Sequence, residues 1–212
     1  MIRFFRDYVL CKSCEDRFSK GGEAYLGTLV ARKDGFPLLD KLKVSLTHRV
    51  EKQHVEFSGS AVGLDTDKLA YFALSVLWRA SVRKWRTLGT QTSSVVLGEY
   101  AEIFRRFLLG ETAFPSYVGV VATVCTDRGS QGFLLSPGEV PDAGRDTQYS
   151  LLVRGIEFRV IVGIPASRLE SVCCVHSLNE VLFLRNCHKE VQHSFDYLLA
   201  KAKTTGKMAR RP

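Results

Sequence analysis

Residues 7–24, DYVLCKSCEDRFSKGGEA, contain the feature on which the fold prediction depends. A short apolar run leads into Cys11 and Cys14, and a polar stretch typical of a helix follows them. Two thiolates at this spacing on a turn and helix start point the same way and can bind one metal ion together. A closed zinc site needs four ligands, and the first 10 residues contain neither cysteine nor histidine. The sequence therefore predicts one half of a zinc site.

The cysteine pair has two other interpretations. Cys11 and Cys14 are small enough to lie partly buried without any ion. A redox-active Cys-x-x-Cys is the third interpretation, but Gly21 and Gly22 interrupt the run after the cysteines. A thioredoxin-like site carries a long helix at this place, so we favour a motif derived from metal binding.

The run YVLCKSCEDRFSKGGEAY at residues 8–25 resembles a bacterial family that is similar to the HNH, or ββα-metal, nucleases. A second stretch that looks familial is YFALSVLWRASV at residues 71–82. The resemblance implies a treble-clef-like zinc knuckle, and longer family members carry a further Cys-x-x-Cys upstream. The matching positions are Leu10, Cys11, Cys14, Glu15, Phe18, Ser19 and Glu23.

The chain departs from this family at its catalytic half. In HNH-like enzymes the general-base histidine lies on the strand before the cysteine pair, and no histidine precedes Cys11 here. We interpret the chain as a family member without its N-terminal catalytic half, through a shortened gene, a late start codon or degeneration. The resemblance implies a role for Glu15 as a ligand of a hard cation such as Mg²⁺. The alternative for Glu15 is an acidic residue that interacts favourably with a helix N-terminus.

Further zinc ligands would have to come from elsewhere in the chain. A predicted final helix at 178–203 places Cys187 and His193 about 120° apart, so they do not share one ion easily. Cys187 falls instead on the apolar stripe of that helix, as a core thiol does. The candidates are Cys173, Cys174, His176, Cys187, His188 and His193.

Basic residues form the candidate nucleic-acid surface. Arg79, Arg83 and Arg86 share one face of a predicted helix and are spaced to follow a phosphate backbone, with Trp78 and Trp85 beside them for stacking. The alternative is a solvated helix face with tryptophans in the core. The remaining candidates are Arg105, Arg106, Lys207, Arg210 and Arg211, within a basic tail that also holds Lys201 and Lys203.

Composition sets the broad class of the protein. The formal net charge is +8 and the pI is about 9.3, which favours anionic partners such as nucleic acid. The six cysteines are irregularly spaced, so we expect reduced thiols. No run reaches the roughly 18 apolar residues that cross a bilayer, and the N-terminus is unlike a secretory signal. We expect a cytoplasmic protein without membrane contact.

Periodicity predicts an α+β fold, with a helical layer and an antiparallel sheet after the zinc-knuckle remnant. Apolar residues alternate from Val44 to Phe57, which indicates a small sheet or hairpin. Helices are expected at 66–86, capped by Asp65, and at about 98–109, closed by Gly110. Strands are expected between 117 and 164, with Arg154 and Gly155 as a hairpin turn. Two regions follow, 1–60 with the knuckle remnant and 61–212 as the α+β body.

These patterns leave three functions open. The first is a nucleic-acid-directed protein of HNH-like descent, from a bacterial mobile or defence locus and inactive as an isolated chain. The second is a structural or partner-binding α+β protein with relic cysteines. The third is an active metal-dependent nuclease completed by an upstream segment or a second subunit.

Overall fold

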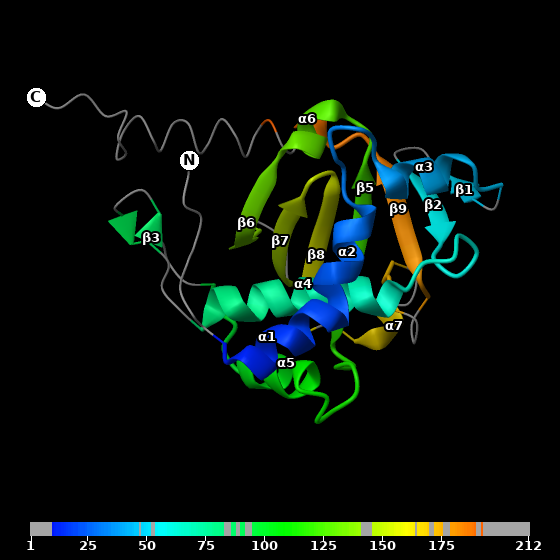
Figure 1. Ribbon diagram of the computed structural model, residues 1–212. Helices are drawn as coiled ribbons and strands as arrows, with labels where there is room; N and C mark the ends of the chain where they lie inside the picture. The colour runs from blue at the N-terminus through cyan, green and yellow to red at the C-terminus, as the bar shows by residue number, and fades with distance from the viewer. Residues whose placement is uncertain are drawn as a thin grey trace, which may run out of the picture.

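A computed structural model describes most of the chain between residues 10 and 192 (Figure 1). The described residues are 10–46, 48–51, 54–82, 86–87, 90–91, 95–140, 146–163, 165–169, 172–175, 179–189 and 192. Within these ranges no helix is both long and apolar enough to cross a membrane.

The centre of the fold is a 7-stranded mixed sheet in the order β1-β2-β9-β5-β8-β7-β6. Neighbouring strands are antiparallel except β5 and β9, which run parallel. The strands are β1 (His48–Val50), β2 (Val55–Ser58), β5 (Val118–Cys125), β6 (Leu134–Glu139), β7 (Thr147–Val153), β8 (Ile156–Val162) and β9 (Val181–Arg185). A separate two-stranded hairpin consists of β3 (Arg86–Thr87) and β4 (Thr90–Gln91).

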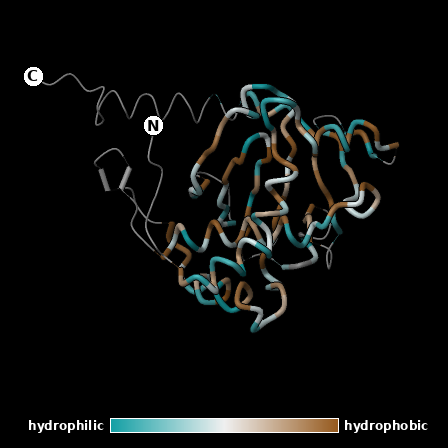
Figure 2. The backbone as a smooth tube through the Cα atoms, viewed as in Figure 1, coloured by the Kyte–Doolittle hydropathy of each residue, from teal (hydrophilic) through white to brown (hydrophobic). Residues whose placement is uncertain are grey.

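One helix packs against the sheet and organises the others. Helix α4 (Thr66–Ser81) contacts β5, β6 and β8, and it also contacts the N-terminal helices and α5 (Tyr100–Leu108). Its fully buried side chains include Leu69, Leu74 and Leu77, and the sheet contributes Phe158 and Ile156 to the same core. Figure 2 shows hydrophobic and hydrophilic residues alternating along strands of the large sheet, and hydrophilic residues at the end that carries α6 (Arg128–Gly132).

The N-terminal region is one nearly continuous helix. Helix α1 (Lys12–Phe18) passes into the π-helical segment η1 (Ser19–Glu23) and then into α2 (Ala24–Leu29). The two glycines of η1 do not break the helix, contrary to our sequence interpretation, so they do not argue against a redox-active Cys-x-x-Cys. They let it approach α4 closely: a Cβ on Gly22 would lie 2.7 Å from the carbonyl oxygen of Lys68. Glycine is therefore required here by packing rather than by a turn.

Local capping signals are confirmed. The Asp65 side chain accepts a hydrogen bond from the Lys68 backbone N–H at 3.1 Å and begins α4. Gly110, with φ of 75°, ends α5. Arg154 and Gly155 both have positive φ, 43° and 90°, as a two-residue hairpin turn between β7 and β8 requires.

Four predicted elements are wrong in detail. The helix predicted at 66–86 ends at Ser81 and Arg86 lies in strand β3, so Arg79 and Arg86 do not share one helix face. The sheet is mixed rather than antiparallel because β9 inserts between β2 and β5. Residues 181–185 form β9 instead of the start of a helix at 178–203, since a short apolar run buried inside a sheet looks like a buried helix segment in periodicity. The hairpin begins at His48, after helix α3 (Pro37–Lys43), and Val44 and Leu46 are exposed.

The α+β class is confirmed, and the treble-clef zinc knuckle remains a prediction. Among the described residues, no group of three or more His, Cys, Asp or Glu side chains is placed to hold a metal ion. The boundary predicted at residue 60 falls just after β2. That strand pairs with β9 of the second predicted region, and both strands belong to the large sheet.

Candidate functional site

The cysteine pair lies at the start of the long N-terminal helix. Cys11 is the residue before α1, has an extended backbone, and its carbonyl accepts a hydrogen bond from the Glu15 N–H at 3.0 Å. Its Sγ lies 3.1 Å from Oγ of Ser13. Cys11 is exposed and Cys14 is partly exposed. Both thiols therefore lie at the same helix start and are open to a ligand from outside.

The two thiols differ in acidity. Hydrogen bonds from the Ser13 hydroxyl, the Cys14 backbone and the Cys14 thiol lower the pKa of Cys11 to about 7. The pKa of Cys14 is raised, first by its hydrogen bond to Cys11 and then by partial burial. Since the thiolate is the form that binds metals and attacks electrophiles, Cys11 is the more reactive member of the pair.

Alkylation should reveal this difference. In chelator-treated protein, we expect modification of Cys11 by iodoacetamide to follow a titration with a midpoint near pH 7, because the thiolate fraction rises with pH through a pKa of about 7. Ser13→Ala removes the largest cause of the shift and should move the midpoint towards the ordinary value of 9.0. Peptide mass spectrometry measures the rate of Cys11 alkylation at each pH in the parent and in Ser13→Ala. Thr28→Ala, further along the helix, is the control. Equal midpoints in Ser13→Ala and the parent would contradict the hydrogen-bond assignment.

Glu15 lies one residue beyond the pair, in the first turn of α1, and its side chain is exposed. This position suits an acidic residue near a helix N-terminus. In the described part of the chain, Glu15 and the two cysteines do not form a group of three side chains placed to hold a metal ion. Its role as a Mg²⁺ ligand remains a prediction.

The structure does not bring the other candidate ligands to this pair. Cys173 and Cys174 are fully buried, burial raises the pKa of both thiols, and the Val120 N–H donates to Sγ of Cys173 at 3.3 Å. Cys187 forms a disulfide with Cys125, so the expectation of six reduced thiols is wrong. The candidates His176 and His193 lie outside the described residues.

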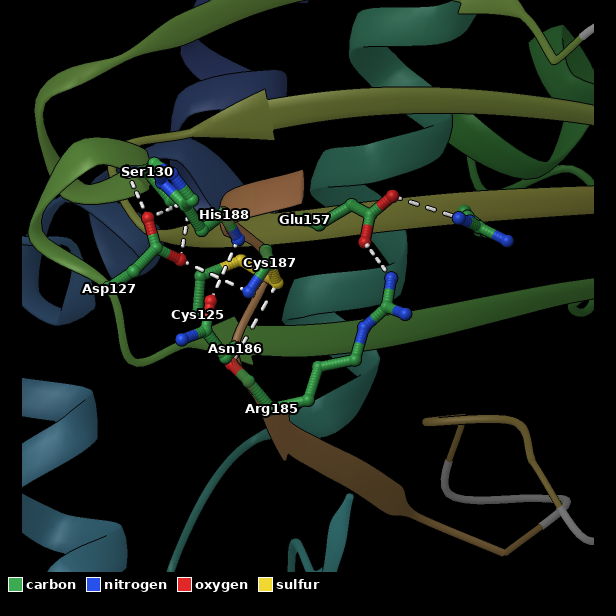
Figure 3. Close-up of polar contacts among 9 residues, drawn as sticks. Cys125, Asp127, Ser130, Glu157, Arg185, Asn186, Cys187 and His188 are labelled. Atoms are coloured by element: carbon green, nitrogen blue, oxygen red, sulfur yellow. Dashed lines mark hydrogen bonds and ion pairs between the residues drawn. A yellow bond between two sulfur atoms is a disulfide. The ribbon is translucent and has the colours of Figure 1, made fainter. Parts of the chain in front are cut away.

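The disulfide between Cys125 and Cys187 and the hydrogen bonds accepted by Asp127 form one junction, which the sequence analysis did not predict (Figure 3). Asp127 accepts hydrogen bonds from the backbone and hydroxyl of Ser130 and, at 3.1 Å, from the Cys187 N–H. Burial opposes ionisation of Asp127, but these hydrogen bonds prevail and lower its pKa. His188, another candidate ligand, is exposed beside this junction. The signal that was available is Asp127 three residues before Ser130, which is a helix N-cap pattern.

Charged side chains extend this junction along the sheet. Glu157 of β8 forms ion pairs with Arg159 at 3.3 Å and with Arg185 of β9 at 3.0 Å (Figure 3). The carboxylate is mostly buried between the two guanidinium groups. This arrangement links two strands of the sheet, so we assign it to the fold rather than to a binding site.

The predicted basic surface is partly occupied by internal contacts. Arg79 forms an ion pair with Glu23, donates to the Ser75 carbonyl at 3.2 Å, and lies over the ring of Phe18. Trp78 packs edge-on against the same Phe18, as expected for a core tryptophan. The guanidinium group of Arg79 therefore contacts residues of the neighbouring helices, and it is not free to bind a phosphate.

Arg105 and Arg106 also have acidic partners. Arg105 binds Glu102 at 2.8 Å and Glu111 at 3.4 Å, while Arg106 lies 3.8 Å from Glu111. These exposed pairs neutralise part of the local positive charge. The side chains of Arg86 and Trp85 and the residues Arg83, Lys207, Arg210 and Arg211 lie outside what the structure describes.

Comparison with known proteins does not assign the chain to a family. No family model matches it, no curated protein is significantly similar in sequence, and no solved structure is significantly similar to the fold.

Proposed function

We propose that this chain is a nucleic-acid-directed protein of HNH-like descent, and that Cys11 and Cys14 are the helix-borne half of a zinc site. The supporting observation is the position of the two thiols. They are accessible, and they are placed one before and one within the first turn of a long helix. The excess of 30 Lys and Arg over 22 Asp and Glu supports an anionic partner.

The same geometry supports binding rather than cleavage. Glu15 can supply one carboxylate to a hard cation, but hydrolysis also needs an activated water and a base. Among the described residues, no histidine forms a metal-binding group with Glu15 and the cysteines to supply that base. We expect the chain on its own to leave DNA and RNA intact in Mg²⁺ or Mn²⁺, and turnover lost in Glu15→Ala would favour the nuclease alternative.

Salt dependence of binding tests the proposed partner. Affinity for duplex DNA, measured by fluorescence anisotropy, should fall steeply with salt, and each lost phosphate contact should flatten the log-log slope by about 0.9. We expect Arg83→Ala with Arg86→Ala to flatten the slope by about 2. Arg79→Ala is the matched control and should leave the slope unchanged, because Glu23 already pairs with its guanidinium. A slope reduced by Arg79→Ala alone would show that this residue faces the phosphates.

A partner-binding protein is the second candidate function. It is favoured by the ion pairs that occupy Arg79, Arg105 and Arg106. Absence of measurable binding to duplex DNA, single-stranded DNA and RNA at about 50 mM salt would select this candidate, because electrostatic binding is strongest at low salt.

A further inference from the structure

We infer that a second copy of this chain completes the zinc site, so that Cys11 and Cys14 of two molecules bind one zinc ion through four thiolates. This inference rests on the zinc half-site in the proposed function. It goes further by naming the source of the two missing ligands, which is a chain identical to this one.

The geometry of the pair suits an ion held between two molecules. Cys11 is the residue before α1 and Cys14 lies in its first turn, and neither side chain is buried, so both thiols can be reached from outside at the same helix start. The residues around them, Lys12, Ser13, Glu15 and Asp16, are all exposed. Among the described residues, these neighbours therefore leave the two thiols open to a second protein surface.

Ligands from within the same molecule are largely committed elsewhere. Cys125 and Cys187 are joined to each other, and Cys173 and Cys174 are fully buried in the core. In the ranges that the structure describes, no third ligand stands near the pair. Figure 1 shows the β1–β2 hairpin, which carries His48 and His54, at the opposite side of the molecule from α1.

Zinc chemistry explains why two copies are sufficient. Structural zinc is tetrahedral and is commonly held by four cysteine sulfurs about 2.3 Å from the metal. A two-fold axis through the ion would present the same pair from each molecule, which gives an isologous contact. On binding, the four thiols release their protons to solvent, and the ion with four thiolates carries a net charge of −2. The N-terminal ends of the two α1 helices and the exposed Lys12 side chains offset this charge.

Zinc stoichiometry and mass, measured together on the full chain, test the inference. We expect about half a zinc ion per chain and a dimer by light scattering when zinc is present, with monomers after chelation by EDTA. Cys11→Ser and Cys14→Ser should each abolish both the ion and the dimer. Because Cys11 is exposed and Cys14 partly so, both variants should remain folded by circular dichroism. Thr28→Ala, further along the same continuous helix and exposed, is the control and should retain both the ion and the dimer.

Two results would overturn the second-copy inference. One full equivalent of zinc on a monomer would show that the missing ligands come from the same molecule, while it would still support the zinc site of the proposed function. A dimer that persists in EDTA and in Cys14→Ser would show that association does not depend on the metal.

Cobalt substitution adds a spectroscopic measurement of the number of thiolate ligands, since four thiolates give intense charge-transfer bands and two give weaker ones. DNA binding measured on the same samples reports separately on the nucleic-acid function.

Discussion

Replacement of Cys187 by serine should lower the free energy of unfolding by about 4 kcal/mol, measured by chemical denaturation without reductant. The disulfide between Cys125 and Cys187 closes a loop of 62 residues, and cross-links of this span restrict the unfolded chain by about that amount. The reduced parent protein should show the same loss. Cys125→Ser and the double variant should each match Cys187→Ser, because all of them remove one bond.

Thiol counting and a neighbouring variant control this prediction. Unfolded parent protein should expose four reactive thiols without reductant and all six with it. His188→Ala changes the exposed residue next to Cys187 and should alter stability by no more than about 0.5 kcal/mol. Six reactive thiols without reductant, together with unchanged stability in Cys187→Ser, would contradict the disulfide.

The disulfide also bears on where the protein is found. Glutathione and thioredoxin keep thiols reduced in the cytosol, so a buried disulfide is uncommon there. The cytoplasmic location therefore remains a prediction that the pairing of Cys125 and Cys187 does not support. The thiol count applied to protein extracted under acid quenching would measure its redox state in the cell.

Elements that depend on local chemistry could be predicted from the sequence. The cap at Asp65, the turn at Arg154 and Gly155, and the glycine that ends α5 each follow from the conformational preferences of one or two residues. The position of Cys11 and Cys14 at a helix start also follows from local order. These features involve partners only a few residues away, and a single sequence contains that information.

Features that depend on distant partners could not be predicted in the same way. The run at 181–185 is a strand because β2 and β5 lie on either side of it, and no local pattern specifies these neighbours. Arg79 is separated by 56 residues from Glu23, its ion-pair partner. Helical periodicity does not contain this contact, so it predicted Arg79 as a phosphate ligand. Cysteine spacing likewise does not determine which cysteines pair.

Gly22→Ala should destabilise the protein by about 1–3 kcal/mol, because the added methyl group has no space between η1 and α4. An ideal Cβ at this position would lie 2.7 Å from the Lys68 carbonyl oxygen and 2.8 Å from the Phe72 backbone nitrogen. Both atoms belong to the backbone of α4, the helix that packs on the sheet, so they cannot rotate away as a flexible side chain would. The change in free energy of unfolding can be measured by urea denaturation.

Gly27→Ala is the matched control because the same substitution then meets open space. Gly27 lies in α2 of the same continuous helix, is exposed, and has no atom within 4 Å of an ideal Cβ. Alanine at an unhindered helix position favours the helix by about 0.5–1 kcal/mol relative to glycine, so this variant should be more stable than the parent. The two substitutions should therefore have opposite signs. If both stabilise the protein, η1 does not pack closely on α4, and the helix that presents Cys11 and Cys14 is not held against the core in the way the structure describes.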